Sequence, residues 1–214
     1  KEAGVAITGD IDIFSKQVAA PIIAVTGSNG KSTVVAMLAE IATKAGKNFG
    51  LGGNLDGDNF KPALDLLAEG ERDLYLLELS SFQLETTQSL GAAVATILNL
   101  SADHMDRYGG IDDYHRAKQR IFTGCKKVVI NRDDKESYPL VESDAAVWDF
   151  GVGRAGVNGL GLLEEDGDLY LAYQLEKIVS VNELKVFGQH NISNVLAAVA
   201  LAMAIDIDMN AIKA

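Results

Sequence analysis

The residues with the clearest capacity for chemistry are the run 26–32, Thr-Gly-Ser-Asn-Gly-Lys-Ser. This run follows a short apolar stretch and opens a segment with helical spacing, as a phosphate-binding loop does. Backbone N–H groups at such a helix start can bind phosphate oxygens, Lys31 can reach terminal phosphates, and Ser32 can ligate Mg²⁺. Val25 occupies the place of the first glycine in the general pattern, so the generic motif is only partly met. An ordinary glycine-rich turn is the weaker alternative, because strand, loop, Lys-Ser-Thr and helix follow in the required order.

Two further candidates are a glutamate and a histidine that follow other apolar runs. Residues 74–78 read Leu-Tyr-Leu-Leu-Glu, and ligands of doubly wound sheets lie beyond the carboxyl ends of the strands. Glu78 is therefore expected to hold Mg²⁺ near Ser32, although a strand-end glutamate that faces solvent fits the pattern equally well. His104, in Asp-His-Met-Asp-Arg-Tyr, could ligate a metal or bind an anion, but an isolated loop histidine is more often structural.

The elements that must position these residues alternate along the chain. Strand-like runs cover 22–26, 48–51, 74–78, 93–98 and 127–130, and helix-like runs cover 32–45, 62–69 and 112–123. This alternation predicts an α/β fold with a P-loop NTPase-like, mostly parallel sheet flanked by helices. Short alternating runs over 160–187, with a turn at Asp166-Gly167, predict a small antiparallel β extension. A final helix is expected to start near Asn191.

Composition narrows the class of function. The net charge of −11 argues against a nucleic-acid or anionic-membrane partner, because both require a basic surface. The single cysteine, Cys125, rules out an internal disulfide and suits a reducing cytoplasm. The longest apolar run, 195–205, is too short to cross a bilayer. We expect a cytoplasmic monomer whose partners are small molecules.

Several segments together resemble the Mur ligase family, the amino-acid-adding ligases of cell-wall synthesis. They are T-G-S-N-G-K-S, L-E-L-S-S-F-Q-L, D-H-M-D-R-Y and G-Q-H-N-x-x-N, and they point to the D-glutamate-adding members. The resemblance runs from about Gly9 to the end and corresponds to the family's central domain. It implies a linker remnant of an N-terminal UDP-binding domain at 1–14, a central ATP-binding domain at 15–206, and the start of a connection to a C-terminal domain at 207–214.

The resemblance also implies roles for individual residues. ATP would be bound by Gly27, Ser28, Asn29, Gly30, Lys31, Ser32 and Thr33, with its adenine on Asn191 and Asn194. The implied metal ligands are Ser32 and Glu78 for a first Mg²⁺, and His104 and a carbamylated Lys118 for a second. Lys31, Glu78, His104 and Lys118 would be the catalytic residues, and Asn54, Ser80, Gln83 and His104 would contact the UDP-sugar substrate. Without the resemblance, Lys118 reads as a helix-surface lysine and Asn191 as a helix N-cap.

The chemistry that the resemblance implies has two steps. The carboxylate of UDP-MurNAc-L-alanine attacks the γ-phosphate of ATP to give an acyl phosphate, and the amine of D-glutamate then displaces phosphate. Because the family contacts D-glutamate mainly through its C-terminal domain, we expect this fragment alone to be inactive in ligation. One departure is a longer loop, with Asp56 to Lys61 lying between Asn54 and Pro62. The alternatives are another amide ligase of the superfamily, such as a folylpolyglutamate synthase, and a non-catalytic nucleotide-binding module.

Overall fold

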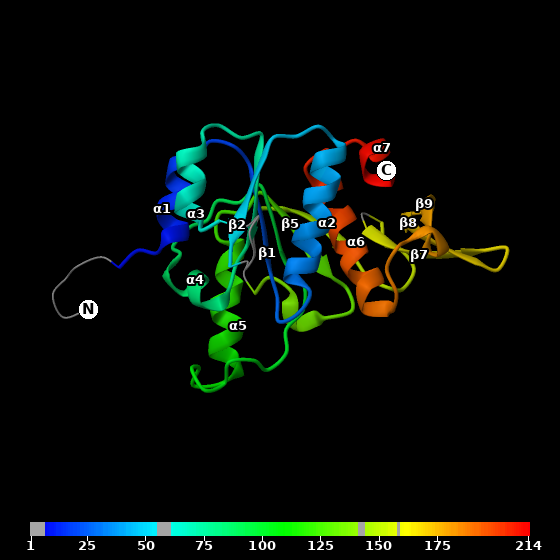
Figure 1. Cartoon of the computed structure of the whole chain (residues 1–214). Coiled ribbons are helices and arrows are strands. Elements are labelled where there is room, and N and C mark those ends of the chain that lie inside the picture. Colours follow the sequence, from blue (N-terminus) through cyan, green and yellow to red (C-terminus); the bar gives the residue numbers. More distant parts are fainter. Residues whose placement is uncertain (1–6, 55–60, 141–143, 158) are drawn as a thin grey trace.

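The structure is a computed structural model that describes residues 7–54, 61–140, 144–157 and 159–214. In this part of the chain nine strands form one sheet in the order β2-β3-β1-β4-β5-β6-β7-β8-β9 (Figure 1). The strands are β1 (Ile22–Thr26), β2 (Phe49–Gly53), β3 (Leu74–Glu78), β4 (Val94–Ile97), β5 (Lys127–Asn131), β6 (Ala146–Phe150), β7 (Gly159–Glu165), β8 (Asp168–Tyr173) and β9 (Glu176–Ser180). All neighbouring strands from β2 to β7 pair in parallel, whereas β7-β8 and β8-β9 are antiparallel. The predicted fold class is confirmed.

Helices cover both faces of the sheet (Figure 1). The helices are α1 (Asp10–Gln17), α2 (Lys31–Lys44), α3 (Ala63–Leu66), α4 (Ser81–Thr86), α5 (Ile111–Gln119), α6 (Gln189–Ala204) and α7 (Met209–Lys213). Short 3-10 turns extend α3 over Leu67–Glu69 and α5 over Arg120–Phe122. Helices α2, α6 and α7 lie on one face, and α1, α3 and α4 lie on the other (Figure 1).

The central strand β1 divides its side chains between two hydrophobic cores. Ile23 and Val25 pack in the core under α2 and α6, while Ile22 and Ala24 pack in the core under α1 and α3. Successive side chains of a strand point to opposite faces, so a strand covered on both faces needs an unbroken apolar sequence. β1 has this sequence, and all five of its residues are buried.

The predicted strands and helices are found close to their expected positions. The hairpin turn is also present, with φ of 54° at Asp166 and 84° at Gly167, which is the left-handed pair that a tight hairpin requires. The strand β6 and the helices α1, α4 and α7 were not predicted. Only Phe150 of β6 is buried, and Asp149 interrupts its apolar residues. The domain boundary expected at residue 15 falls inside α1 and remains a prediction.

Candidate nucleotide-binding site

The phosphate-binding loop lies at the carboxyl end of β1. At this strand the order in which successive strands are added to the sheet reverses. β1 pairs with β3 on one side and β4 on the other, and ligands of doubly wound sheets bind at such a switch point. Gly30 caps α2 with a φ of 83°, in the left-handed region that favours glycine. A Cβ at Gly30 would lie 2.5 Å from Oδ1 of Asn194 on α6. The end of the loop therefore fits closely against α6.

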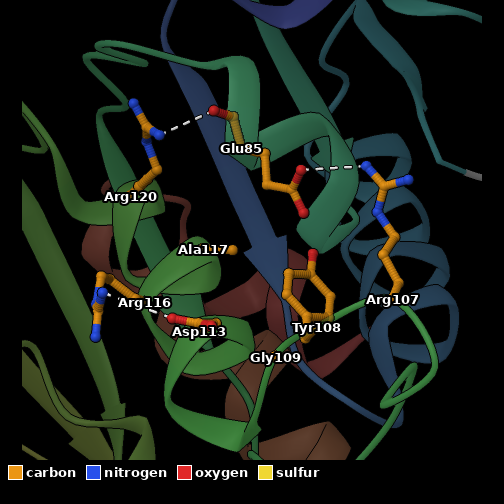
Figure 2. Close-up of a pocket in the computed structure, with 8 residues that line it drawn as sticks. All are labelled: Glu85, Arg107, Tyr108, Gly109, Asp113, Arg116, Ala117 and Arg120. Carbon is orange, nitrogen blue, oxygen red and sulfur yellow. Dashed lines mark hydrogen bonds and ion pairs between the residues drawn. The ribbon is translucent and has the colours of Figure 1, made fainter.

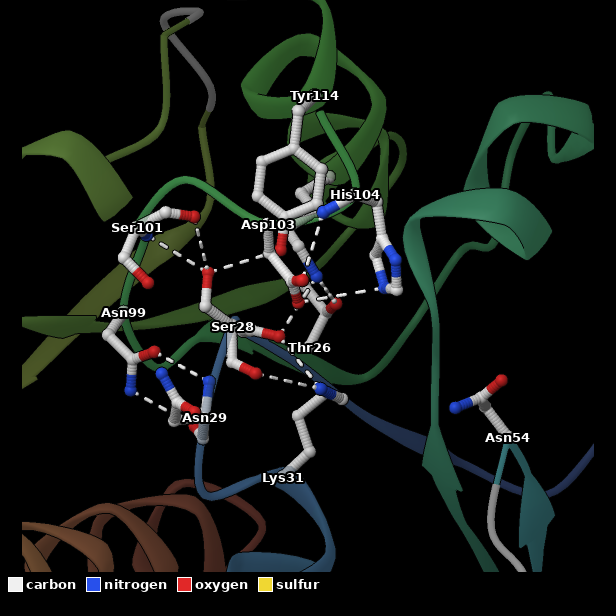
Figure 3. Close-up of polar contacts among 12 residues, drawn as sticks. Thr26, Ser28, Asn29, Lys31, Asn54, Asn99, Ser101, Asp103, His104 and Tyr114 are labelled. Atoms are coloured by element: carbon white, nitrogen blue, oxygen red, sulfur yellow. Dashed lines mark hydrogen bonds and ion pairs between the residues drawn. The ribbon is translucent and has the colours of Figure 1, made fainter. Parts of the chain in front are cut away.

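The segment that follows β4 supports the loop from the side (Figure 3). Asn99 accepts a hydrogen bond from the Asn29 N–H at 2.8 Å and donates one to the Asn29 carbonyl at 3.0 Å. The Ser101 N–H donates to the Ser28 hydroxyl at 2.9 Å, and the Tyr114 hydroxyl lies 3.1 Å from the same Ser28 oxygen. Sequence reasoning missed these contacts, because only the pairing of β1 with β4 brings the two segments together.

Lys118 is buried against the phosphate loop, so its interpretation as a surface lysine is wrong. It is 2% exposed and donates to the Thr26 hydroxyl at 3.1 Å and to the Gly27 carbonyl at 2.9 Å. Lys31 donates to the same carbonyl at 3.0 Å and to the Ser28 carbonyl at 3.2 Å. Burial, and secondly the charge of Lys31, lower the pKa of Lys118 to about 7. An amine with this pKa is partly neutral near pH 7.

Glu78 and Ser32 are joined across the ends of β3 and β1. The Ser32 hydroxyl donates to Glu78 Oε2 at 2.8 Å, and Glu78 is only 2% exposed, so the solvent-facing interpretation of Glu78 is wrong. Asn54, at the end of β2, donates from Nδ2 to Glu78 Oε1 at 3.4 Å. These oxygen atoms have the hard character that Mg²⁺ prefers, and they adjoin the phosphate loop. The donor set fits a magnesium ion that is shared with a bound nucleotide.

His104 lies on the loop above this cluster, and its side chain is 49% exposed. Its Nε2 is 3.6 Å from Asp103 Oδ2 (Figure 3). Its ring centroid is 5.0 Å from that of Phe82. The described contacts of Lys118 lead instead to Thr26, Gly27 and the Tyr114 ring. Within the described residues, no group of three His, Cys, Asp or Glu side chains is arranged to hold a metal. The pairing of His104 with Lys118 at a second metal site remains a prediction.

The two asparagines predicted for adenine lie on the first turns of α6. The helix starts at Gln189 after the cap residue Gly188, so the interpretation of Asn191 as N-cap is wrong. Asn191 donates from Nδ2 to the Phe187 carbonyl at 2.8 Å, and Asn194 donates to Asn191 Oδ1 at 3.5 Å. Since Asn194 also abuts Gly30, this pair is continuous with the phosphate loop.

The predicted substrate residues Ser80 and Gln83 form a capping box at the start of α4. The Ser80 hydroxyl accepts from the Gln83 N–H at 3.2 Å, and Gln83 Oε1 accepts from the Ser80 N–H at 3.1 Å. Ser80 follows β3 by two residues and so lies near Glu78. Residues 55–60, which include most of the longer loop at Asp56 to Lys61, fall outside the described residues. Lys61 is described and pairs with Gly52 in a bridge.

A separate hollow of about 740 Å³ lies between α4, α5 and the loop that contains Arg107 (Figure 2). Arg107 donates to the carboxylate of Glu85 at 3.2 Å, and Arg120 donates to the Glu85 carbonyl at 2.8 Å. The residues that line the hollow are Glu85, Arg107, Tyr108, Gly109, Asp113, Arg116, Ala117 and Arg120. None of them was predicted to bind ATP, metal or substrate.

A β1 strand, phosphate loop and α2 helix beside a strand-end glutamate define a nucleotide-binding α/β domain of the P-loop class. Residues 25–202 match the Mur ligase middle domain, and the chain belongs to that family. It is 51% identical to the UDP-N-acetylmuramoylalanine–D-glutamate ligase of Pseudomonas aeruginosa over 97% of its length, and 50% identical to that of Hahella chejuensis over 94%. It covers only 45% and 44% of those two relatives, so it spans less than half of their length.

Solved structures support the same fold. The structure of a UDP-N-acetylmuramoyl-L-alanyl-D-glutamate–2,6-diaminopimelate ligase matches with a TM-score of 0.72 and 26% identity, over 90% of this chain and 45% of that one. The structure of Escherichia coli FolC in complex with DHPP and ADP matches with a TM-score of 0.69 over 98% of this chain and 61% of that one. At 19% identity this second match shows a shared fold alone. None of the helices in the described ranges is long and apolar enough to span a lipid bilayer.

Proposed function

We propose that this chain is the ATP-binding core of a peptidoglycan-precursor ligase that adds D-glutamate to UDP-MurNAc-L-alanine. The observation that carries the proposal is the pairing of Ser32 on the phosphate loop with the buried carboxylate of Glu78, in a chain 51% identical to D-glutamate ligases. Because the chain covers under half of those relatives, ligation is proposed for a longer parent protein. The isolated chain is proposed to bind ATP without completing ligation.

The phosphate loop, residues Gly27 to Thr33, would hold the ATP phosphates through its backbone N–H groups and Lys31. Lys31 now donates to the Gly27 and Ser28 carbonyls and would exchange these acceptors for phosphate oxygens. Ser32 and Glu78 would ligate a Mg²⁺ ion, which supplies charge neutralisation for the transferred phosphoryl group. Asn191 and Asn194 would bind the adenine, since asparagine amides match the donor and acceptor on its edge.

Lys118 is proposed to carry a carbamate that, with His104, completes a second Mg²⁺ site. Its neutral amine would condense with CO₂, forming an N–C bond and releasing one proton, which turns a cation into an oxygen donor. Deep burial and the lowered pKa of Lys118 favour the neutral amine that this step needs. His104 contacts Asp103 and Phe82, and Asp103 is among the charges that act on Lys118.

The UDP-sugar substrate is proposed to contact Asn54, Ser80, Gln83 and His104. Its carboxylate would attack the γ-phosphate of ATP, and the resulting acyl phosphate would react with the amine of D-glutamate. The attacking carboxylate and the γ-phosphate are both anionic, so the positive charge of Lys31 would stabilise the transferred phosphoryl oxygens. We also propose that the protein is a cytoplasmic monomer. Its charge of −11 argues against nucleic-acid and anionic-membrane partners.

Calorimetric titration of Mg²⁺-ATP into this chain tests the proposal. We expect binding by the natural sequence and at least roughly ten-fold weaker binding by Lys31→Ala, because a charge-assisted phosphate contact is lost. Lys47→Ala is the matched control, since Lys47 is exposed beyond the far end of α2. Equal affinities for the natural chain and Lys31→Ala would contradict the nucleotide site. Release of ligation product by the chain alone would contradict the proposal that it needs flanking parts.

A further inference from the structure

The ring of Phe82, in the first turn of α4, contacts three side chains of the loop that joins β4 to α5. This loop covers residues 98–110 and carries His104. The His104 ring centroid is 5.0 Å from that of Phe82, and the Tyr108 ring stacks on Phe82 at 6.2 Å. The guanidinium carbon of Arg107 is 4.5 Å from the centre of the same ring. Phe82 is 38% exposed, and within the described residues its aromatic and cation–π partners all belong to this loop.

Arg107 contacts α4 at two points. Its guanidinium lies over the Phe82 ring, and its Nη2 donates to the carboxylate of Glu85 at 3.2 Å (Figure 2). Phe82 and Glu85 are three positions apart in α4, which is the spacing of neighbours on one helix face. An exposed ion pair alone contributes little because water screens it, but a planar guanidinium that also stacks on a ring has a preferred orientation. Arg107 therefore fixes the loop to α4.

A tight turn connects this attachment to His104. The His104 carbonyl accepts hydrogen bonds from the Arg107 N–H at 3.0 Å and from the Tyr108 N–H at 3.3 Å. His104 has a φ of 55°, in the left-handed region that is uncommon for residues other than glycine. His104 and Arg107 thus belong to one closed turn, so the position of one determines the position of the other.

The same loop is attached to the phosphate loop. The Ser101 N–H donates to the Ser28 hydroxyl at 2.9 Å. A second connection runs through aromatic rings, because Tyr108 contacts Tyr114 at a centroid distance of 5.4 Å and the Tyr114 hydroxyl is 3.1 Å from the Ser28 hydroxyl. The 98–110 loop therefore bridges the phosphate loop and α4.

We propose that Phe82 is a positioning residue that, together with Arg107, holds His104 in place between the phosphate loop and the start of α4. The inference rests on the proposed function, which assigns substrate contacts to His104 and to the capping residues Ser80 and Gln83. Phe82 lies between these two capping residues in the chain. One short helix thus presents two substrate residues and, beside them, the anchor of the third. The three proposed substrate contacts then move as one unit.

Amide hydrogen exchange of the nucleotide-free 214-residue chain tests the anchor itself. Phe82→Leu keeps an apolar side chain and removes the ring, so residues 104–108 should exchange roughly ten-fold faster, as loss of a cation–π and an aromatic contact of typical strength allows. Arg107→Lys keeps an ion pair with Glu85 but loses the planar stack, and should have a similar effect. Phe82→Tyr keeps the ring and should exchange like the natural chain. Leu64→Ala, on α3 at a position 39% exposed, is the matched control and should leave the loop unchanged.

Paramagnetic broadening by Mn²⁺-ATP tests the position of His104. Mn²⁺ would replace Mg²⁺ at the proposed site on Ser32 and Glu78, and it broadens NMR signals with an effect that falls steeply with distance. The His104 ring signals, assigned by their loss in His104→Gln, should be broadened in the natural chain and in Phe82→Tyr. In Phe82→Leu most of this broadening should be lost, because the turn is released toward solvent. The affinity for ATP should stay unchanged, which separates a loop anchor from general damage to the fold.

The outcomes separate this inference from the proposed function. If Phe82→Leu matches the natural chain in loop exchange and in His104 broadening, the positioning role is wrong and the nucleotide site stands. If exchange rises equally in α2 and α6, Phe82 supports the whole domain, which also overturns the inference. If ATP binds the natural chain but Mn²⁺-ATP broadens no His104 signal, His104 is not held near the nucleotide and the inference fails. If the natural chain does not bind ATP, the proposed function fails and the role given to His104 fails with it.

Discussion

Lys118 and Lys31 donate hydrogen bonds to one acceptor, the carbonyl oxygen of Gly27, at 2.9 Å and 3.0 Å. The two amines approach this oxygen from α5 and from the start of α2. Lys118 is buried beside Tyr114, with its Nζ 4.9 Å from the centre of that ring. Burial and the neighbouring amine therefore act in the same direction, and both favour loss of the Lys118 proton.

The first prediction concerns stability against pH. The pKa of Lys118 is lowered from 10.5 to about 7 on folding, so between these values the unfolded chain binds a proton that the folded chain lacks. Unfolding free energy then rises with pH across this window, and the gain is lost as pH falls toward 7. Lys118→Met should flatten the rise between pH 7 and pH 9 by up to about 2 kcal/mol, measured by urea unfolding. If the unfolding free energies of the natural chain and Lys118→Met changed with pH in parallel, the lowered pKa of Lys118 would be wrong.

The second prediction isolates the contribution of Lys31. Lys31→Met removes the like charge that shares Gly27, so the pKa of Lys118 should rise, although burial keeps it below 10.5. NMR titration of the Lys118 side-chain ε-carbon signal measures this shift. Lys47→Met, a change of the same type at an exposed site, should leave the titration unchanged. An unchanged midpoint in Lys31→Met would show that the two amines do not interact.

The third prediction concerns the carboxylate of Glu78. Glu78→Gln keeps the shape and can still accept from Ser32, but it removes the negative charge that a divalent cation needs. We expect the affinity for ATP to lose most of its dependence on Mg²⁺, with Mg²⁺-ATP bound roughly ten-fold more weakly. Titrations with and without Mg²⁺ measure the effect. Glu40→Gln, on the exposed side of α2, is the control, and an identical Mg²⁺ response in both variants would exclude Glu78 as a ligand.

The fourth prediction separates backbone strain from contact at Gly30. Gly30→Ala and Gly46→Ala both place a side chain at positive φ, 83° and 66°, and each should lose about 1 kcal/mol of stability in thermal melts. Only Gly30→Ala also pushes against Asn194, because Gly46 has open space where a Cβ would be. Gly30→Ala should therefore bind Mg²⁺-ATP more weakly, while Gly46→Ala should bind it normally. Equal binding by the two variants would mean that the contact with α6 does not matter.

The parts of the fold that could be predicted from sequence are those whose burial is uniform. Strands β1 and β3 were predicted to the residue because all of their residues are buried, and each has four apolar residues followed by one polar residue. β6 has exposed and half-exposed positions and leaves no such run. The short helix α4 was missed, although Ser80 and Gln83 have the spacing of a capping box.

The candidate site also has parts that the sequence could predict and parts that it could not. The phosphate loop is local, so its sequence shows it directly. Lys118 and Asn99 depend on partners 91 and 70 positions away, and only the parallel pairing of strands brings them together. Lys118 lies on the same face of α5 as the buried Tyr114 and Ala117, but its charged side chain favoured a surface position when the sequence was read alone. The family resemblance supplied its expected role, and the fold supplies its burial.

Ser80 and Gln83, which are proposed to contact the substrate, also form the capping box of α4. Ser80 and Gln83 already bind each other at the start of a six-residue helix. Replacing either residue would remove its own side-chain contacts. It would also free the other residue and shift the start of the helix. Natural variation at the two positions should therefore be correlated, with hydroxyl and amide gained or lost as a pair, even in relatives whose sugar substrate is the same.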